Sequence, residues 1–181
     1  SRGWVIIAIG LPSLYLTYGY TGGPVPLAYL GLGELFVILF FGMVAVGGTF
    51  YVQTGEWLWP AGVVGLQVGL LSAVLIAINN LRDLEEDRQS GKETLAVRLG
   101  PRVLQKMAGG FVILAMILSL CGRYYGAGWF FLLSFPWFVV GVTCIRGVKS
   151  SLPGRHYNRF LAGAALQLVL FAVLFTVAAA I

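Results

Sequence analysis

Charged residues are scarce in this sequence. They make up 10% of its 181 residues, whereas soluble domains carry about 25%. Hydrophobic residues account for 59%, and the mean hydropathy is +0.88. So little polar surface cannot cover a water-facing domain. The composition and the long apolar runs therefore predict an integral membrane protein.

Cysteine and histidine are also rare, which limits metal and redox chemistry. Cys121 and Cys144 lie in or at the ends of apolar runs without CxxC spacing, so we interpret both as packing residues. His156, the single histidine, lies in a short polar segment and is interpreted as a solvated loop residue. No basic stripe is interleaved with aromatic residues on a soluble module, so the net charge of +5 does not indicate nucleic-acid binding.

The alternation of apolar and polar residues typical of a membrane β-barrel is absent. Six apolar runs instead predict an all-α, polytopic transmembrane helix bundle, because backbone groups in lipid need partners within their own segment. We treat residues 1–181 as a single transmembrane domain whose first helix is short. The predicted helices are Trp4–Tyr18, Glu34–Val52, Trp59–Ile78, Val103–Gly122, Gly128–Ile145 and Phe160–Ile181.

The basic residues are distributed unequally between the two sides of the predicted bundle. All lysines and arginines except Arg2 and Arg123 lie in or beside the loops 18–33, 79–102 and 146–159, which fall on one side. Such asymmetry places that side in the cytoplasm. We therefore expect a multi-pass protein of the cell membrane, with the segment from Asn79 to Gly100 on the cytoplasmic side.

Acidic residues are concentrated in that same segment. Five of the seven lie between Asp83 and Glu93, and no helix breaker occurs before Gly91. If the preceding helix continues, Asn79, Asp83 and Asp87 share one face. Two carboxylates at this spacing repel each other by about 0.2–0.5 kcal/mol. A divalent cation would offset the repulsion, and Mg²⁺ is typically held by one or two carboxylates plus substrate phosphates.

Basic and amide side chains in the segment suit the other half of such a site. Arg82 can bind a diphosphate with its guanidinium fork, as lysine does with its point charge. Further candidates for substrate contacts are Asn79, Asn80, Lys92, Thr94 and Arg98. The alternative is a solvated loop with ordinary ion pairs such as Arg82–Glu86, on a membrane bundle that has no enzymatic activity. Residue types alone leave both interpretations open.

Two stretches resemble a known family. NNLRDLEEDRQSGKETLAVRLG, from Asn79 to Gly100, closely resembles the second aspartate-rich motif of the UbiA superfamily of intramembrane prenyltransferases. Its form is similar to the branch that prenylates 1,4-dihydroxy-2-naphthoate in menaquinone biosynthesis, or to the phytyl-transferring relative. YTGGPVPLAYLGLGELFVILFFG, from Tyr20 to Gly42, resembles a loop and helix of the same branch.

The resemblance implies a nine-helix bundle with two aspartate-rich motifs facing each other across a central cavity. They bind a prenyl diphosphate through Mg²⁺. The polyprenyl chain passes to 1,4-dihydroxy-2-naphthoate, diphosphate leaves, and the acceptor loses its carboxylate as CO₂. The implied metal ligands are Asp83 and Asp87, with Arg82 as a third catalytic residue. No acid precedes Glu34, so we expect this chain to lack the first motif and three N-terminal helices.

Glu34 is the remaining candidate site residue. It follows a GLG segment at the cytoplasmic start of a predicted helix. One interpretation is a carboxylate that stabilises the helix N-terminus. The other, suggested by its place in the second matching stretch, is a polar group near the aromatic substrate.

Overall fold

The computed structural model describes residues 3–22, 26 and 29–181. These residues form helices joined by turns and short irregular segments, and no strand occurs in them. The elements are α1 (Gly3–Thr21), α2 (Gly33–Val37), the π-helix η2 (Ile38–Gly47), α3 (Gly48–Thr54), α4 (Trp59–Arg82), α5 (Leu84–Gln89), α6 (Leu95–Leu99), α7 (Pro101–Leu118), the 3₁₀-helix η3 (Ser119–Tyr125), α8 (Phe130–Leu133), α9 (Phe135–Lys149), the 3₁₀-helix η4 (Arg155–Tyr157) and α10 (Asn158–Ala180).

All six predicted helices are present. Five are long and apolar enough to cross a membrane, while the described apolar part of α1, Gly3–Tyr15, is shorter. The five are Gly33–Thr54, Trp59–Arg82, Pro101–Tyr124, Phe130–Lys149 and Arg155–Ala180. The prediction of a polytopic membrane helix bundle is therefore confirmed.

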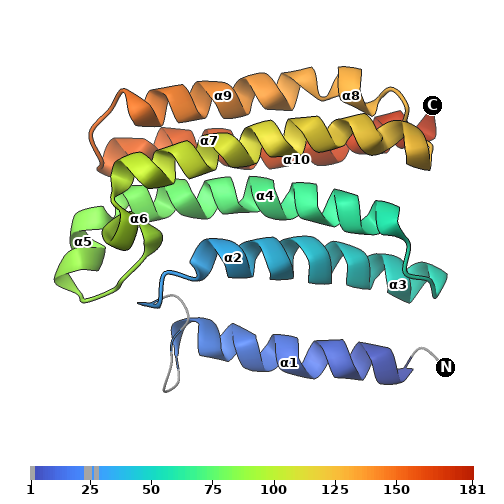
Figure 1. Ribbon diagram of the computed structural model, residues 1–181, viewed down its shortest axis with the longest axis horizontal. Coiled ribbons are helices and arrows are strands. Elements are labelled where there is room, and N and C mark those ends of the chain that lie inside the picture. The colour runs from blue at the N-terminus through green and yellow to red at the C-terminus, as the bar shows by residue number, and fades with distance from the viewer. Residues whose placement is uncertain (1–2, 23–25, 27–28) are drawn as a thin grey trace.

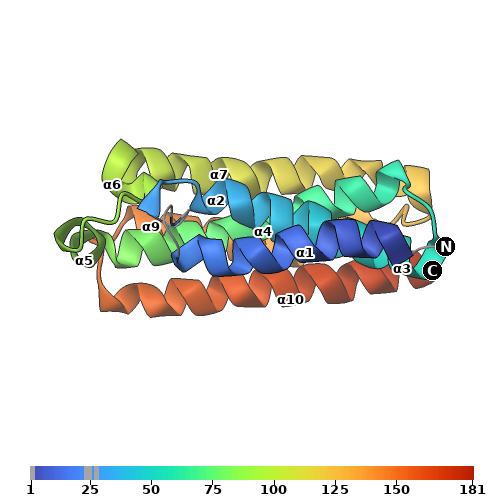
Figure 2. The same ribbon diagram turned by 90° about the horizontal axis from the view of Figure 1, so that it is seen from below.

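The helix α4 occupies the centre of the bundle (Figures 1 and 2). It contacts η2, α7 and α10, and most of its small and aliphatic residues are buried. The short helices α5 and α6 lie at one end, together with the turn between α9 and α10. The start of α1 and the end of α10 lie at the opposite end. The segments that carry most of the charge are thus gathered at one end of the bundle.

Glycines let the second helix approach α4 closely. A Cβ atom at Gly69 of α4 would lie 2.9 Å from the Cα atom of Ile38, and one at Gly65 would lie 3.0 Å from the carbonyl oxygen of Gly42. Small residues at membrane helix interfaces allow such backbone contact. The contact places the start of α2, which carries Glu34, against the end of α4.

The structure corrects one sequence-based prediction. The helix was expected to run unbroken through the aspartate segment, but it turns at Asp83, where φ is −94° and ψ is 11°. The amides of Asp83 and Asp87 still donate to the carbonyls of Asn79 and Asp83, at 3.0 and 2.8 Å. Adjacent side chains do not face each other on a regular helix. The contact between Arg82 and Asp83 described below accompanies this departure from helical geometry.

Candidate functional site

The guanidinium of Arg82 binds the carboxylate of Asp83 with a two-pronged contact. Nε donates to Oδ1 at 2.6 Å and Nη2 donates to Oδ2 at 2.7 Å. Nη2 also donates to Oδ1 of Asn79 at 3.0 Å, and the Asn79 amide donates to Asp83 Oδ2 at 3.4 Å. Bidentate contacts of this kind fix orientation as well as adding energy. The orientation of the Asp83 carboxylate is therefore fixed by Arg82 and Asn79 on α4.

Asp87 is held by a different base. It is buried on α5, and its Oδ1 accepts a hydrogen bond from Lys92 Nζ at 3.1 Å. Its other oxygen, Oδ2, is buried and has no hydrogen-bond partner among the described residues. The two aspartates thus have separate basic partners, and each carboxylate charge is balanced locally.

Glu34 and Asn80 form a buried contact between α2 and α4. The Asn80 amide donates to Glu34 Oε1 at 3.1 Å, and both side chains are almost fully buried. Glu34 also interacts electrostatically with Lys92. Lys92 therefore lies within electrostatic reach of two carboxylates, from Glu34 and Asp87. This contact network joins the two stretches that carry the family resemblance, although residues 23–25 and 27–28 of the second stretch lie outside the described residues.

The remaining predicted residues lie beside this network. Thr94 is buried, and its hydroxyl oxygen has no partner in the part of the chain that the structure describes. Arg98 donates from Nη2 to Glu93 Oε2 at 2.6 Å near the surface. A Cβ atom at Gly31, where φ is +68°, would lie 3.0 Å from both Arg98 Cδ and the Glu93 carbonyl oxygen. The turn before α2 therefore packs directly on this pair.

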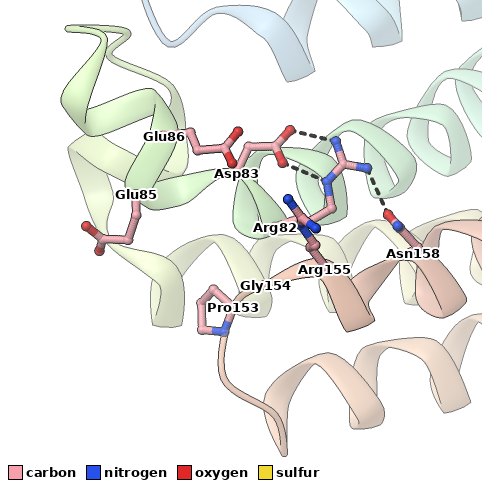
Figure 3. Close-up of a pocket in the computed structure, with 8 residues that line it drawn as sticks. All are labelled: Arg82, Asp83, Glu85, Glu86, Pro153, Gly154, Arg155 and Asn158. Atoms are coloured by element: carbon pink, nitrogen blue, oxygen red, sulfur yellow. Dashed lines mark hydrogen bonds and ion pairs between the residues drawn. The ribbon is translucent and has the colours of Figure 1, made fainter.

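A cavity of about 410 Å³ opens beside Asp83 (Figure 3). One wall is formed by Arg82, Asp83, Glu85 and Glu86 at the end of α4 and on α5. The other wall is formed by Pro153, Gly154, Arg155 and Asn158, where the chain enters α10. Asn158 accepts a hydrogen bond from Arg82 Nη1 at 3.0 Å.

Sequence reasoning missed the second wall of this cavity. Arg155 and Asn158 were not among the candidate site residues, although both lie in the loop 146–159 that was assigned to the same side. The signal that could have found them is the distribution of positive charge, which already placed loops 79–102 and 146–159 on one side of the membrane.

The charged end of the bundle provides only part of the ligand set that a metal ion needs. No group of three or more His, Cys, Asp or Glu side chains in the described residues is arranged to hold one. The unpartnered Oδ2 of Asp87 and the carboxylate of Asp83 are nevertheless oxygen ligands of the kind that Mg²⁺ prefers.

Together these features define a polytopic membrane helix bundle with a charged site at one end. The model of the UbiA prenyltransferase family matches residues 1–162. The chain belongs to this family.

Three curated relatives have names that state the group transferred and the acceptor. A 1,4-dihydroxy-2-naphthoate octaprenyltransferase of Mycobacterium tuberculosis is 34% identical over 93% of this chain and 57% of its own length. An enzyme of the same name from Haemophilus influenzae is 44% identical over 51% of this chain and 30% of its own length. A 2-carboxy-1,4-naphthoquinone phytyltransferase of Synechocystis is 30% identical over 77% of this chain and 47% of its own length.

The chain thus spans between 30% and 57% of the length of these three relatives. No solved structure matches it significantly. That a first aspartate-rich motif and three helices precede this chain stays a prediction.

Proposed function

We propose that the complete gene product transfers a polyprenyl chain from an allylic prenyl diphosphate to 1,4-dihydroxy-2-naphthoate, with loss of the acceptor's carboxylate as CO₂. The observation that carries this proposal is that Asp83 and Asp87, each paired with a basic residue, lie at one end of an apolar bundle. The names of the M. tuberculosis and H. influenzae relatives support the choice of acceptor. The product would be demethylmenaquinone.

Asp83 and Asp87 are the residues that would hold Mg²⁺. Their carboxylates are hard oxygen ligands, and the buried Oδ2 of Asp87 has no hydrogen-bond partner within the described structure. When bound, Mg²⁺ supplies positive charge that stabilises the departing diphosphate. An octahedral Mg²⁺ needs further ligands, which we expect from the substrate and from the first motif.

The other site residues orient this pair and the substrate. Arg82 holds Asp83 through its two-pronged contact, and Lys92 holds Asp87. Electrostatic groups that are fixed before the reaction need no reorganisation as charge develops. The apolar helices keep water away from the reactive allylic group. We further infer that this charged end faces the cytoplasm, because the basic residues are concentrated there.

The test is transfer by the complete gene product in membranes, with Asp83→Ala and Asp87→Ala compared with the native protein. We expect both variants to lose at least about 99% of the activity, because removing a single preorganised electrostatic group from an active site costs roughly 2.7–4 kcal/mol of barrier. Glu56→Gln is the matched control, since Glu56 lies between α3 and α4 and this connection is at the end of the bundle opposite to α5 (Figure 1). Undiminished transfer by either aspartate variant would refute the site assignment.

A phytyl donor is the second candidate, because the Synechocystis relative is named for phytyl transfer. Competition between phytyl diphosphate and a polyprenyl diphosphate in the same membranes separates the two. Preferential transfer of the polyprenyl chain supports the first proposal.

A further inference from the structure

Arg82 has little hydrogen-bonding capacity left for a substrate. Its guanidinium carries five N–H groups. Nε donates to Asp83, the two N–H groups of Nη2 suit Asp83 and Asn79, and one from Nη1 is directed to Asn158. Arg82, although it lines the cavity, therefore uses most of its N–H groups in contacts within the protein.

The charge balance of the cavity identifies a second cation. Asp83 is paired with Arg82, and Glu85 is paired with Arg88 at 2.9 Å. Among the described residues, neither Arg155 nor Glu86 makes an ion pair, although both line the cavity. Arg155 is solvent-exposed and projects beside Arg82 in Figure 3. Its guanidinium is the available cation of this cavity.

The segment that carries Arg155 is fixed by its own contacts. Tyr157 is fully buried, and its hydroxyl lies 2.9 Å from the Val148 carbonyl oxygen and 3.0 Å from that of Ser151. The Tyr157 amide donates to the Gly154 carbonyl at 2.9 Å. Gly154 has φ of 150°, a conformation that side-chain-bearing residues rarely adopt. The backbone position of Arg155 is thus fixed by the turn in which it lies.

We propose that the cavity between α5 and the start of α10 binds the diphosphate end of the prenyl substrate, with Arg155 as its guanidinium ligand. Arg82, which donates to Asn158 on the opposite wall, holds the Asp83 carboxylate beside Arg155. A guanidinium binds two phosphate oxygens through parallel N–H groups, which suits this role. Glu86 opposes an anion in the same cavity and so limits affinity for the diphosphate product. This inference rests on the proposed function.

The experiment measures binding of inorganic diphosphate to the complete gene product in neutral phosphatidylcholine nanodiscs with magnesium chloride. We expect Arg155→Gln to weaken binding by at least about tenfold, because hydrogen bonds to charged groups contribute roughly that factor or more. Glu86→Gln should tighten binding by about two- to fivefold, because it removes a nearby like charge.

Arg159→Gln is the matched control. Arg159 lies four residues further along, is exposed, and packs its guanidinium over the Phe160 ring at 4.6 Å without lining the cavity. Its variant should bind diphosphate within about twofold of the native protein. Equal losses in both arginine variants, or native affinity in Arg155→Gln, would overturn the assignment. Arg155→Lys keeps the positive charge but lacks the parallel N–H groups of the guanidinium. Its diphosphate affinity is compared with that of the native protein if Arg155→Gln unfolds.

A lipid phosphate offers the same chemistry as a diphosphate. Thermal unfolding in nanodiscs with and without phosphatidylglycerol separates the two sources. Loss of phosphatidylglycerol stabilisation in Arg155→Gln, with native diphosphate affinity, would assign Arg155 to headgroups and overturn the proposal. Prenyl transfer by the native protein is assayed separately. Arg155-dependent diphosphate binding without transfer to the naphthoate would show that the proposed acceptor is wrong while the cavity assignment holds.

Discussion

The amide of Asn80 donates to the carboxylate of Glu34 at 3.1 Å, across 46 residues of sequence. Both side chains are buried, and the second carboxylate oxygen of Glu34 has no partner in the described structure. Glu34 therefore joins α2 to α4 at Asn80, three residues before Asp83.

Replacing Asn80 tests how much this contact contributes. Asn80→Ala leaves the buried Glu34 carboxylate without its amide donor, so we expect the free energy of unfolding to fall by about 1–3 kcal/mol. Thermal unfolding in detergent measures the change. In a double-mutant cycle, Asn80→Ala should cost less in a Glu34→Leu background, because no buried carboxylate then lacks a donor. Equal costs in both backgrounds would show that the contact is energetically unimportant.

The Lys92–Asp87 pair should contribute more to stability than the Arg98–Glu93 pair. Asp87 is 9% exposed at its side chain, whereas Arg98 and Glu93 are 41% and 60% exposed. Lys92→Met leaves a buried carboxylate without its base, and we expect a loss of about 1–3 kcal/mol. Arg98→Met should cost less than about 1 kcal/mol. Chemical or thermal unfolding of the two variants side by side provides the comparison, and the reverse order would contradict it.

Gly69 should not tolerate a methyl group. Alanine at this position would place Cβ against the backbone of Ile38, forcing η2 away from α4 at a cost of about 1–3 kcal/mol. Gly110→Ala on α7 is the control, because an added Cβ meets nothing within 4 Å there. That change should be neutral or slightly stabilising, since alanine favours the helix. Melting temperatures that fall by the same amount in both variants would argue against a specific backbone contact.

Tyr157→Phe should loosen the turn that presents Arg155. The variant keeps the buried ring and removes the hydroxyl that contacts the carbonyls of Val148 and Ser151. We expect about 0.5–1.5 kcal/mol of lost stability and weaker binding of inorganic diphosphate. Calorimetric titration checks the second effect. Unchanged diphosphate affinity in a destabilised protein would show that the turn does not need this hydroxyl to shape the cavity.

The sequence predicted the helices well because membrane spans depend on composition and length, which a single chain displays directly. Charge distribution likewise brought the segments around Asp83 and Arg155 to one end. The partners of individual side chains were harder to predict from the sequence. The four-residue spacing predicted a shared helix face for Asp83 and Asp87. The chain turns at Asp83 instead, and each aspartate pairs with a different basic residue. Choices among nearby bases depend on local backbone geometry, which periodicity does not encode.

The hydrogen bond between Arg82 and Asn158 spans 76 residues, which has a consequence for biosynthesis. At about 5–20 residues per second, Asn158 is added roughly 4–15 seconds after Arg82. During that interval the end of α4 is stabilised by contacts with its sequence neighbours and with α2, which is made earlier. Completion of the charged cavity is therefore a late event of membrane insertion, and a ribosome-bound chain that ends before Pro153 has only one of its two walls.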